Sequence, residues 1–510
     1  MAKPIIDHEP GFLPRSIDET IEALVPMGVL FRWAGGLCRL HTLAKDQAGP
    51  VRRAKGSIVL VPVDADHLVE LATDAAVHRK WDGRAADYKV TNCPRGIPAG
   101  ILARGHWPEF PELVGVVESA TLDLDGEEIS MPGYHAKSGL YVATSHKLPA
   151  MKGVAGRARG ERGIKTLEKL LADFPFVSDT DRAAALAAIM TALLRRLLPS
   201  APMFAVTAPT PGTGKTLLAE IFSLIATGRR PPVLSMGHDE NEFTKRVYGV
   251  LLAGDTVLLI DNVTRPMGNE DVLNQLLSQP ILRFRPLGGS GMVSAPTNVL
   301  VTVTGNNLSV VGDAKRRTCL IRLDAKVERP EQREFARDIL AETLTSRDEL
   351  IRAALEVTRS YVDAGCPAVD ARPYGSFSDW DRMVRRPLIW LGLPDPLQAS
   401  EGLRDADPDM ECMRLLFMAW NDKYGDSALT AAEVVKDGLD RFLRDDGKPG
   451  ALINPDLYDA LQLATGEKIN ARRLGNWLRY HKDRIIDGLQ LAQAGSDGHT
   501  KVASWKVIAL

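Results

Sequence analysis

The stretch Met203-Phe204-Ala205-Val206-Thr207-Ala208-Pro209-Thr210-Pro211-Gly212-Thr213-Gly214-Lys215-Thr216 decides the fold. Its first four residues are apolar and favour a buried strand, whereas the next residues, Leu217 to Phe222, favour a helix. A strand, a glycine-rich loop and a helix in this order place backbone N–H groups and a helix N-terminus around a bound anion. The sequence therefore predicts a phosphate-binding loop.

The residues of this loop have separate expected roles. Lys215 would reach the β- and γ-phosphates of ATP, and the Thr216 hydroxyl would bind Mg²⁺. The full predicted cofactor-binding set is Pro211, Gly212, Thr213, Gly214, Lys215, Thr216 and Leu217. One residue departs from the pattern G-x-x-x-x-G-K-[ST], because Pro209 occupies the first glycine position.

Length and composition set the broad class. The chain has 510 residues, 45% hydrophobic and 25% charged, which is ordinary for a soluble protein of two to four domains. A net charge of -2 argues against a uniformly basic protein but allows basic residues confined to one surface. The five cysteines form no C-x-x-C pair, so neither a zinc site nor a disulfide framework is predicted. No secretory or membrane-spanning segment is recognised, and we expect a cytoplasmic protein without membrane contact.

A second motif follows about 46 positions after Lys215. The apolar run Thr256 to Ile260 ends in Asp261, which predicts a strand buried on both faces with its last residue at the carboxyl edge of a parallel sheet. From there Asp261 would hold Mg²⁺ through water. A strand at 233–236 and a helix at 240–252 fill the interval. A structural cap is the alternative role for Asp261.

Two further strands end or begin with polar residues. The strand 299–303 leads to Thr304-Gly305-Asn306-Asn307, and an amide such as Asn306 would orient the water that attacks the γ-phosphate. Lys315-Arg316-Arg317 precede the strand 319–323, where Arg316 or Arg317 would act on the ATP of a neighbouring subunit as an arginine finger. A plain turn and a solvated surface pair are the alternatives.

Together, the motifs at 211–216, 259–262, 304–307 and 312–317 resemble the AAA+-type core of superfamily 3-like helicases of phages, prophages and plasmids, often the helicase half of primase-helicase proteins. The resemblance covers about Asp179 to Asp324. It implies an ATP-driven ring, most often a hexamer, that moves along DNA during replication, and it makes a separate primase a candidate partner.

Asn262 departs from the pattern of many AAA+ proteins, which carry glutamate directly after the metal-binding aspartate. An amide orients water but cannot accept its proton, so Asn262 would serve only the first role. Either Asp261 acts alone as the base, or a carboxylate of Asp239, Glu240 or Glu242 contributes; these three residues equally suit a helix N-terminus.

Two basic segments are the predicted DNA contacts. Residues 283–293 read as a hairpin with a glycine-rich turn, and the resemblance places such a hairpin in the ring channel, with Arg283 and Arg285 on phosphates. Near the C-terminus, three helices and a terminal hairpin form a winged-helix pattern. Its third helix, 469–480, would carry Arg472, Arg473 and Arg479 into a DNA groove, with Ile469, Leu474, Trp477, Leu478 and Ile485 on its core side.

The predicted fold class is α/β: a P-loop AAA+-type parallel-sheet core with a mixed α+β N-terminal domain and a C-terminal winged-helix domain. The expected boundaries are 1–175 for a collar or oligomerisation domain, 176–328 for the ATPase core, 329–425 for a helical region packing on the core, and 426–510 for the winged helix. Residues 149–160 read as a basic linker. Alternatives to a helicase are an AAA+ remodelling or defence ATPase that does not unwind DNA, and an ATP-assembled, sequence-specific DNA-binding initiator or regulator.

Overall fold

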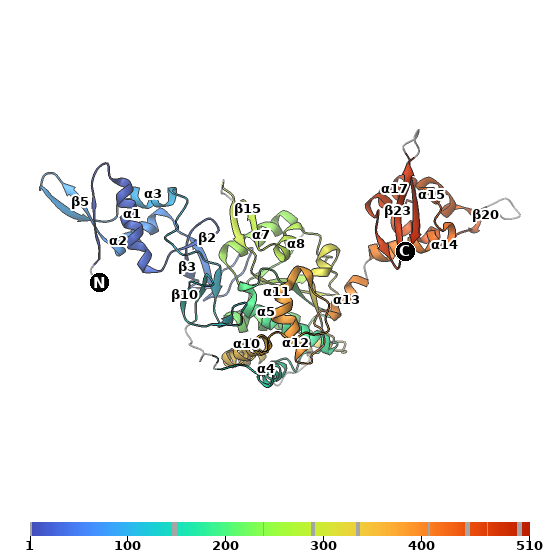
Figure 1. The fold of residues 1–510 in the computed structure, drawn as a ribbon, viewed down its shortest axis with the longest axis horizontal. Coiled ribbons are helices and arrows are strands. Elements are labelled where there is room, and N and C mark those ends of the chain that lie inside the picture. The colour runs from blue at the N-terminus through green and yellow to red at the C-terminus, as the bar shows by residue number, and fades with distance from the viewer. Residues whose placement is uncertain are drawn as a thin grey trace. The chain divides into compact units, whose positions relative to one another are not determined.

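The computed structural model describes residues 3–144, 151, 153–237, 239–286, 291–332, 337–405, 408–443, 449–466, 468–496 and 502–510. The chain forms two compact units, Met1–Ser400 and Glu401–Leu510. The boundary between the two units therefore lies at 400/401, before the domain boundary at 425/426 that the sequence predicts. Figure 1 shows the ribbon coloured along the chain.

The first unit begins with short strands and three helices. Its elements are β1 (Ile5–His8), α1 (Leu13–Leu24), β2 (Phe31–Trp33), β3 (Gly36–Thr42), β4 (Ile58–Pro62), α2 (Ala65–Ala75), β5 (Val77–Asp82), β6 (Asp87–Thr91), α3 (Gly96–Ala103), β7 (Gly115–Val117), β8 (Thr121–Leu122), β9 (Glu128–Ile129), β10 (Gly133–His135) and β11 (Leu140–Val142). The apolar run 58–63 predicts a strand and the segment from Ala65 predicts a helix, and β4 and α2 confirm both. The turn-rich segment 122–141 predicts a short β-meander, but the structure has two separate hairpins there, β8–β9 and β10–β11, in different sheets.

A parallel sheet of five strands forms the centre of the first unit. Its strands are β12 (Met203–Ala208), β13 (Val233–Leu234), β14 (Val257–Val263), β17 (Leu300–Asn306) and β18 (Thr318–Arg322). They lie in the order β13-β14-β17-β12-β18, and every neighbouring pair is parallel. Four of these strands are almost wholly buried, as expected for a parallel sheet covered on both faces. The α/β class with a parallel sheet is therefore confirmed.

Helices and one hairpin surround this sheet. They are α4 (Arg157–Leu170), α5 (Asp179–Leu194), α6 (Lys215–Thr227), α7 (Glu240–Ala253), α8 (Asp271–Ser278), the hairpin β15 (Ile281–Phe284) and β16 (Val293–Pro296), α9 (Ile339–Thr345), α10 (Arg347–Asp363), α11 (Ser378–Trp380), α12 (Arg386–Trp390) and α13 (Gln398–Asp405). Helix α5 is alanine-rich and nearly completely buried, which lets α6, α10 and the sheet approach it closely.

Helix α4 lies along α10, as Figure 1 shows, and its leucines and isoleucine join the same apolar cluster as the sheet. The segment 149–160, predicted as a basic linker, is therefore helical from Arg157 onward. Helix α4 falls within the predicted N-terminal domain 1–175, but it packs with the parallel-sheet core. The physical reason is the spacing of Ile164, Leu167, Leu170 and Leu171, which places apolar side chains on one face of a helix.

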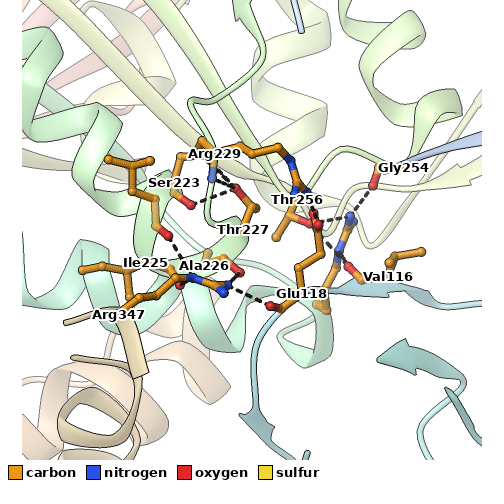
Figure 2. A network of polar contacts seen from close by, with 12 residues as sticks. Val116, Glu118, Ser223, Ile225, Ala226, Thr227, Arg229, Gly254, Thr256 and Arg347 are labelled. Carbon is orange, nitrogen blue, oxygen red and sulfur yellow. Dashed lines mark hydrogen bonds and ion pairs between the residues drawn. The ribbon is translucent and has the colours of Figure 1, made fainter. Parts of the chain in front are cut away.

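A polar network fixes the far end of α6, the helix that follows the phosphate-loop motif (Figure 2). Arg347, at the start of α10, donates to the carbonyls of Leu224, Ile225 and Ala226 at 3.0 Å each and to the Glu118 carbonyl at 2.8 Å. The Glu118 carboxylate in turn pairs with Arg229. The last carbonyls of a helix lack intrahelical partners, so a half-buried guanidinium stabilises this end. The network ties α6 to α10 and to the segment after β7.

The second unit has its own apolar core. Its elements are α14 (Pro408–Tyr424), β19 (Leu429–Thr430), α15 (Ala431–Leu439), β20 (Arg441–Leu443), β21 (Pro449–Leu452), α16 (Pro455–Thr465), α17 (Ala471–Tyr480), β22 (Ile485–Ile486), β23 (Leu489–Ser496) and β24 (Ala503–Ala509). Strands β19, β24, β23 and β22 form one antiparallel sheet in that order. Thr430, whose position before an apolar-periodic segment predicts an N-cap, caps α15 through a capping box with Glu433.

Two expectations for this unit need correction. Helix α14 was expected to pack on the ATPase core, but Met413, Leu416, Phe417 and Trp420 are buried in the core of the second unit. Ile485 was expected on the core side and is 56% exposed, whereas its neighbour Ile486 is buried. Successive side chains of a strand point to opposite faces, so an error of one position exchanges an inner for an outer residue.

Among the described residues, no helix is both long and apolar enough to cross a membrane.

Candidate functional site

The carboxyl edge of the parallel sheet gathers the predicted site residues. Asp261 lies near the end of β14, Asn306 is the last residue of β17, and the phosphate-loop motif begins where β12 ends at Ala208. These three strands are neighbours in the sheet, and Asn306 pairs with Ala208. The topology therefore brings together three segments that are nearly a hundred positions apart in the sequence.

The loop between β12 and α6 has the backbone that a phosphate-binding loop requires. Gly212 and Gly214 have φ values of 77° and 97°, a conformation that favours glycine. A Cβ at Gly212 would also lie 2.9 Å from the backbone nitrogen of Glu331, so the position has no room for a side chain. No hydrogen bond joins the N–H groups of residues 212–216 to an acceptor in the part of the chain that the structure describes. These donors remain for an anion.

Lys215 lies inside the curl of the loop. Its Nζ donates to the Thr210 carbonyl at 3.0 Å and to Thr213 Oγ1 at 3.2 Å. Burial lowers the pKa of Lys215, and the charge of Asp261 partly opposes that shift. A partly desolvated ammonium without a close carboxylate gains most from an incoming phosphate, because the phosphate replaces the lost hydration.

Thr216 and Asp261 meet across the edge of the sheet. Thr216 Oγ1 donates to Asp261 Oδ1 at 3.0 Å, although the two residues lie on α6 and β14. A hydroxyl and a carboxylate oxygen at this separation form the hard oxygen ligand pair that Mg²⁺ prefers. These residues thus fit the expected metal, but the metal role stays a prediction.

Thr304 is the residue that sequence reasoning did not single out. Its hydroxyl donates to Asp261 Oδ1 at 2.5 Å and accepts the Asn262 N–H at 3.1 Å, and the side chain is buried. It thereby fixes the orientation of the carboxylate and the turn at Asn262. The only sequence signal was a polar residue near the end of an otherwise aliphatic strand, and that signal is common.

Asn262 occupies a left-handed backbone conformation with φ of 55°, which asparagine tolerates better than most residues. It lies in an irregular step of the β14–β17 pairing, and Gly305 on β17 makes room there. Asp239, one of the alternative carboxylates, accepts the N–H groups of Asn241 and Glu242, so it caps α7. The capping interpretation of that acidic group is therefore confirmed for Asp239.

An apolar cavity of about 190 Å³ adjoins the loop. Phe174 and Leu217 line it together with Ile339 and Leu340, and Asp173 and Arg337 lie at its margin. Arg337 is held by Glu342 and Asp173, so these polar groups already neutralise one another. The lining and volume of this cavity would suit a flat, largely apolar ring.

Arg316 and Arg317 lie at the opposite edge of the same sheet, in the short turn η3 (Gly312–Arg317) before β18. Their environments differ sharply. Both pair with Asp313, but the Arg316 side chain is 54% exposed and the Arg317 side chain 11% exposed. Arg317 also donates to the Asn274 carbonyl at 3.0 Å. Arg317 is therefore built into the fold, and Arg316 is the one that can leave its partner.

The predicted DNA contacts lie on two separate elements. The hairpin β15–β16 is confirmed, with Arg283 opposite Ser294; residues 287–290 of its turn lie outside the described residues. Arg283 and Arg285 are exposed, whereas Phe284 between them is buried and stacks on Tyr248 of α7 at 3.9 Å. The hairpin is thus anchored to α7 with its arginines on the other face.

On α17 the three predicted arginines are exposed. Arg473 donates to the Thr465 carbonyl at 2.8 Å, and Arg479 donates to the side chain of Asn476 at 3.0 Å. Leu474 and Leu478 face the core, as expected, and Trp477 is partly buried against it.

Comparisons with known proteins give limited guidance. No family model matches this sequence, and no curated protein matches it. One similar solved structure is the apo A form of the NrS-1 C-terminal region, with 12% identity, a TM-score of 0.37 and coverage of 96% of this chain and 99% of that chain. Another is JCV helicase, with 13% identity, a TM-score of 0.20 and coverage of 49% of this chain and 73% of that chain. Such low similarity does not assign a function to the chain.

Proposed function

We propose that this chain is an ATP-dependent DNA helicase of a mobile genetic element, which works as a ring, most simply a hexamer, and translocates on DNA during replication. The observation that carries the proposal is the assembled sheet edge, where Lys215, Thr216, Asp261 and Asn306 converge. In this proposal the protein is cytoplasmic, and its cofactors are ATP and Mg²⁺.

Each residue at this edge has a distinct task. The free N–H groups of residues 212–216 and Lys215 bind the β- and γ-phosphates. Thr216 and Asp261 hold Mg²⁺, which neutralises charge on the phosphate oxygens. Asn306 orients the attacking water, and Thr304 keeps Asp261 in position. Asn262 cannot accept a proton, so Asp261 is the first candidate for the base, and the expected turnover is slow or dependent on DNA.

The position of the arginines supports a ring. Thr318 at the start of β18 pairs with Met203, five residues before the loop, and five residues of strand span about 16 Å. Arg316 therefore cannot reach the phosphates bound by its own chain. In a ring it would reach the ATP of the neighbouring subunit.

A short segment of chain connects the phosphate loop to the hairpin β15–β16, so hydrolysis could move the hairpin. Only three residues separate the end of β16 from the start of β17, and β17 ends at Asn306 beside the phosphate loop. Movement of the rigid strand β17 would shift Arg283 and Arg285 along a DNA strand.

The second unit would contact duplex DNA. Helices α15, α16 and α17 with the hairpin β23–β24 match the winged-helix pattern, and Arg472 and its neighbours on α17 are exposed. This observation also favours the rival function of an ATP-assembled, sequence-specific initiator.

A strand-displacement assay on forked DNA with ATP tests the proposal. The intact protein should separate the strands, and Lys215→Ala should not. The double variant Arg283→Ala/Arg285→Ala should lose DNA-stimulated ATP hydrolysis. Arg162→Ala/Lys165→Ala, which removes two exposed charges of α4, is the matched control and should keep it. Hydrolysis without any unwinding would favour a remodelling ATPase, and binding of one duplex sequence without unwinding would favour the initiator.

A further inference from the structure

The second unit carries an open groove that the proposed function does not use. The groove lies between α14 and α16, has a volume of about 560 Å³, and includes residues of the turn before α16. Helix α17 contributes no residue to its lining among the described residues. The groove is therefore separate from the arginines expected to contact DNA.

The walls of the groove carry apolar side chains that are exposed to solvent. Leu415 and Met418 on α14 are 38% and 47% exposed, and Ile453 before α16 is 43% exposed. Leu415, Met418 and Asp422 follow each other at helical spacing on the outward side of α14, whereas Leu416, Phe417 and Trp420 fill the core. Helix α14 thus has two apolar faces, of which one has no partner among the residues of the second unit that the structure describes.

The rim of the groove is acidic. Asp422, Asp456 and Asp459 line it, and none of them has an ion-pair partner in the part of the chain that the structure describes. Among the described residues of the lining, Lys423 is the one cation, and its Nζ lies 3.5 Å from Asp437 Oδ2, which neutralises it. Three unpaired carboxylates repel DNA phosphates and attract a cationic partner.

We propose that this groove is a docking site for a basic amphipathic helix of a partner protein. Leucine-like side chains at positions i, i+3 or i+4, and i+7 of the partner would cover Leu415, Met418 and Ile453. Its lysines or arginines would face Asp422, Asp456 and Asp459. The assignment does not depend on ATP hydrolysis or on DNA binding.

Fluorescence anisotropy on the full-length protein tests this docking site. The probe is a labelled synthetic helix with leucines at every third or fourth position and lysines elsewhere, used at about 0.15 M salt to screen weak contacts. The lysine peptide should bind, and the same peptide with glutamates in place of lysines should not. Equal binding of the two peptides would overturn the proposal.

Variants inside and outside the groove show whether the lysine peptide binds in the groove or to the general surface. Asp456→Lys/Asp459→Lys should weaken binding of the lysine peptide about tenfold, since each exposed ion pair contributes up to about 1 kcal/mol. Met418→Asp should weaken it through the apolar wall. The controls Asp426→Lys and Leu463→Asp change exposed residues outside the groove and should leave binding unchanged. If controls and groove variants weaken binding equally, the proposal fails.

Amide hydrogen exchange adds an independent measurement. The amide hydrogens of α14 and α16 should exchange faster in the free protein than in the protein with the lysine peptide bound. If these amides are already protected in the free protein and the peptide does not change them, another part of the chain covers the groove and the proposal is wrong.

Discussion

Replacing Arg316 and Arg317 one at a time with alanine should separate two neighbouring arginines by function. Arg316→Ala removes a half-exposed ion pair with Asp313, which contributes at most about 1 kcal/mol to the free energy of unfolding. Arg317→Ala removes a buried side chain that bonds both Asp313 and the Asn274 carbonyl, and we expect a loss of about 2–3 kcal/mol. Urea unfolding measures both differences.

For ATP turnover the order of the two variants should be reversed: Arg316→Ala should lower turnover more than Arg317→Ala does. If Arg316 acts on a neighbour's nucleotide, Arg316→Ala should lower turnover about a thousandfold while the fold stays intact. Arg317→Ala should retain turnover at temperatures where it is still folded. The assay is phosphate release by protein that has first been shown to be folded by circular dichroism.

Mixed assemblies decide whether the arginine acts between subunits. Arg316→Ala and Lys215→Ala should each lack normal turnover alone, but a mixture would place an intact Arg316 beside an intact Lys215 at some interfaces and should recover turnover. No recovery in the mixture, together with a protein that stays monomeric in the presence of nucleotide, would refute the reasoning. So would full activity of Arg316→Ala.

Three further perturbations test other parts of the structure. Thr304→Val should raise the Mg²⁺ concentration needed for half-maximal ATP hydrolysis and lower the unfolding free energy by about 1–3 kcal/mol, because the Asn262 N–H loses its acceptor; a Mg²⁺ titration with no change would contradict the positioning role. Arg347→Met should destabilise the first unit by about 2–3 kcal/mol, since the Ile225 and Ala226 carbonyls of α6 lose their guanidinium donor, although the Leu224 carbonyl keeps the Gly228 N–H; the exposed Arg162→Met should not, and equal urea midpoints would argue against this network. Burial lowers the pKa of His8 and His78 below 6.5, so the unfolded chain binds protons more readily and the sheet β1-β5-β6 should lose stability as the pH falls below about 6.5. Amide exchange of these strands, corrected for the intrinsic effect of pH, should rise between about pH 7.5 and 5.5 in the native protein and should rise less in His8→Gln, which keeps only His78.

Local sequence was sufficient for the elements of the ATPase-like core. The strand at 203–206, the helix after Lys215, the helix near 240–252 and the hairpin around Arg283 are all present. Each rests on a short-range property: an apolar run, a glycine loop, a capping aspartate or alternating residues about a turn. Such signals do not depend on the rest of the chain, so they can be recognised without it.

The boundaries and the partners of buried polar groups were beyond sequence reasoning. Helix α14 has apolar residues on two faces, so periodicity alone could not say which core it joins. Arg316 and Arg317 are adjacent and identical in type, and only their surroundings show that one is exposed and the other built in. The roles assigned to the site residues stay predictions, although their positions are now known.

By itself, the sequence determined that strand, glycine loop and helix would form in this order around Lys215, because that arrangement depends only on residues next to each other. Tertiary structure alone decided that β17 lies between β12 and β14, which brings Thr304 and Asn306 beside Asp261 and the loop, and places Arg316 at the far edge. The physical reason is that strand order depends on burying many apolar side chains at once, and contacts across the sheet join residues too far apart in the chain for any local pattern to record.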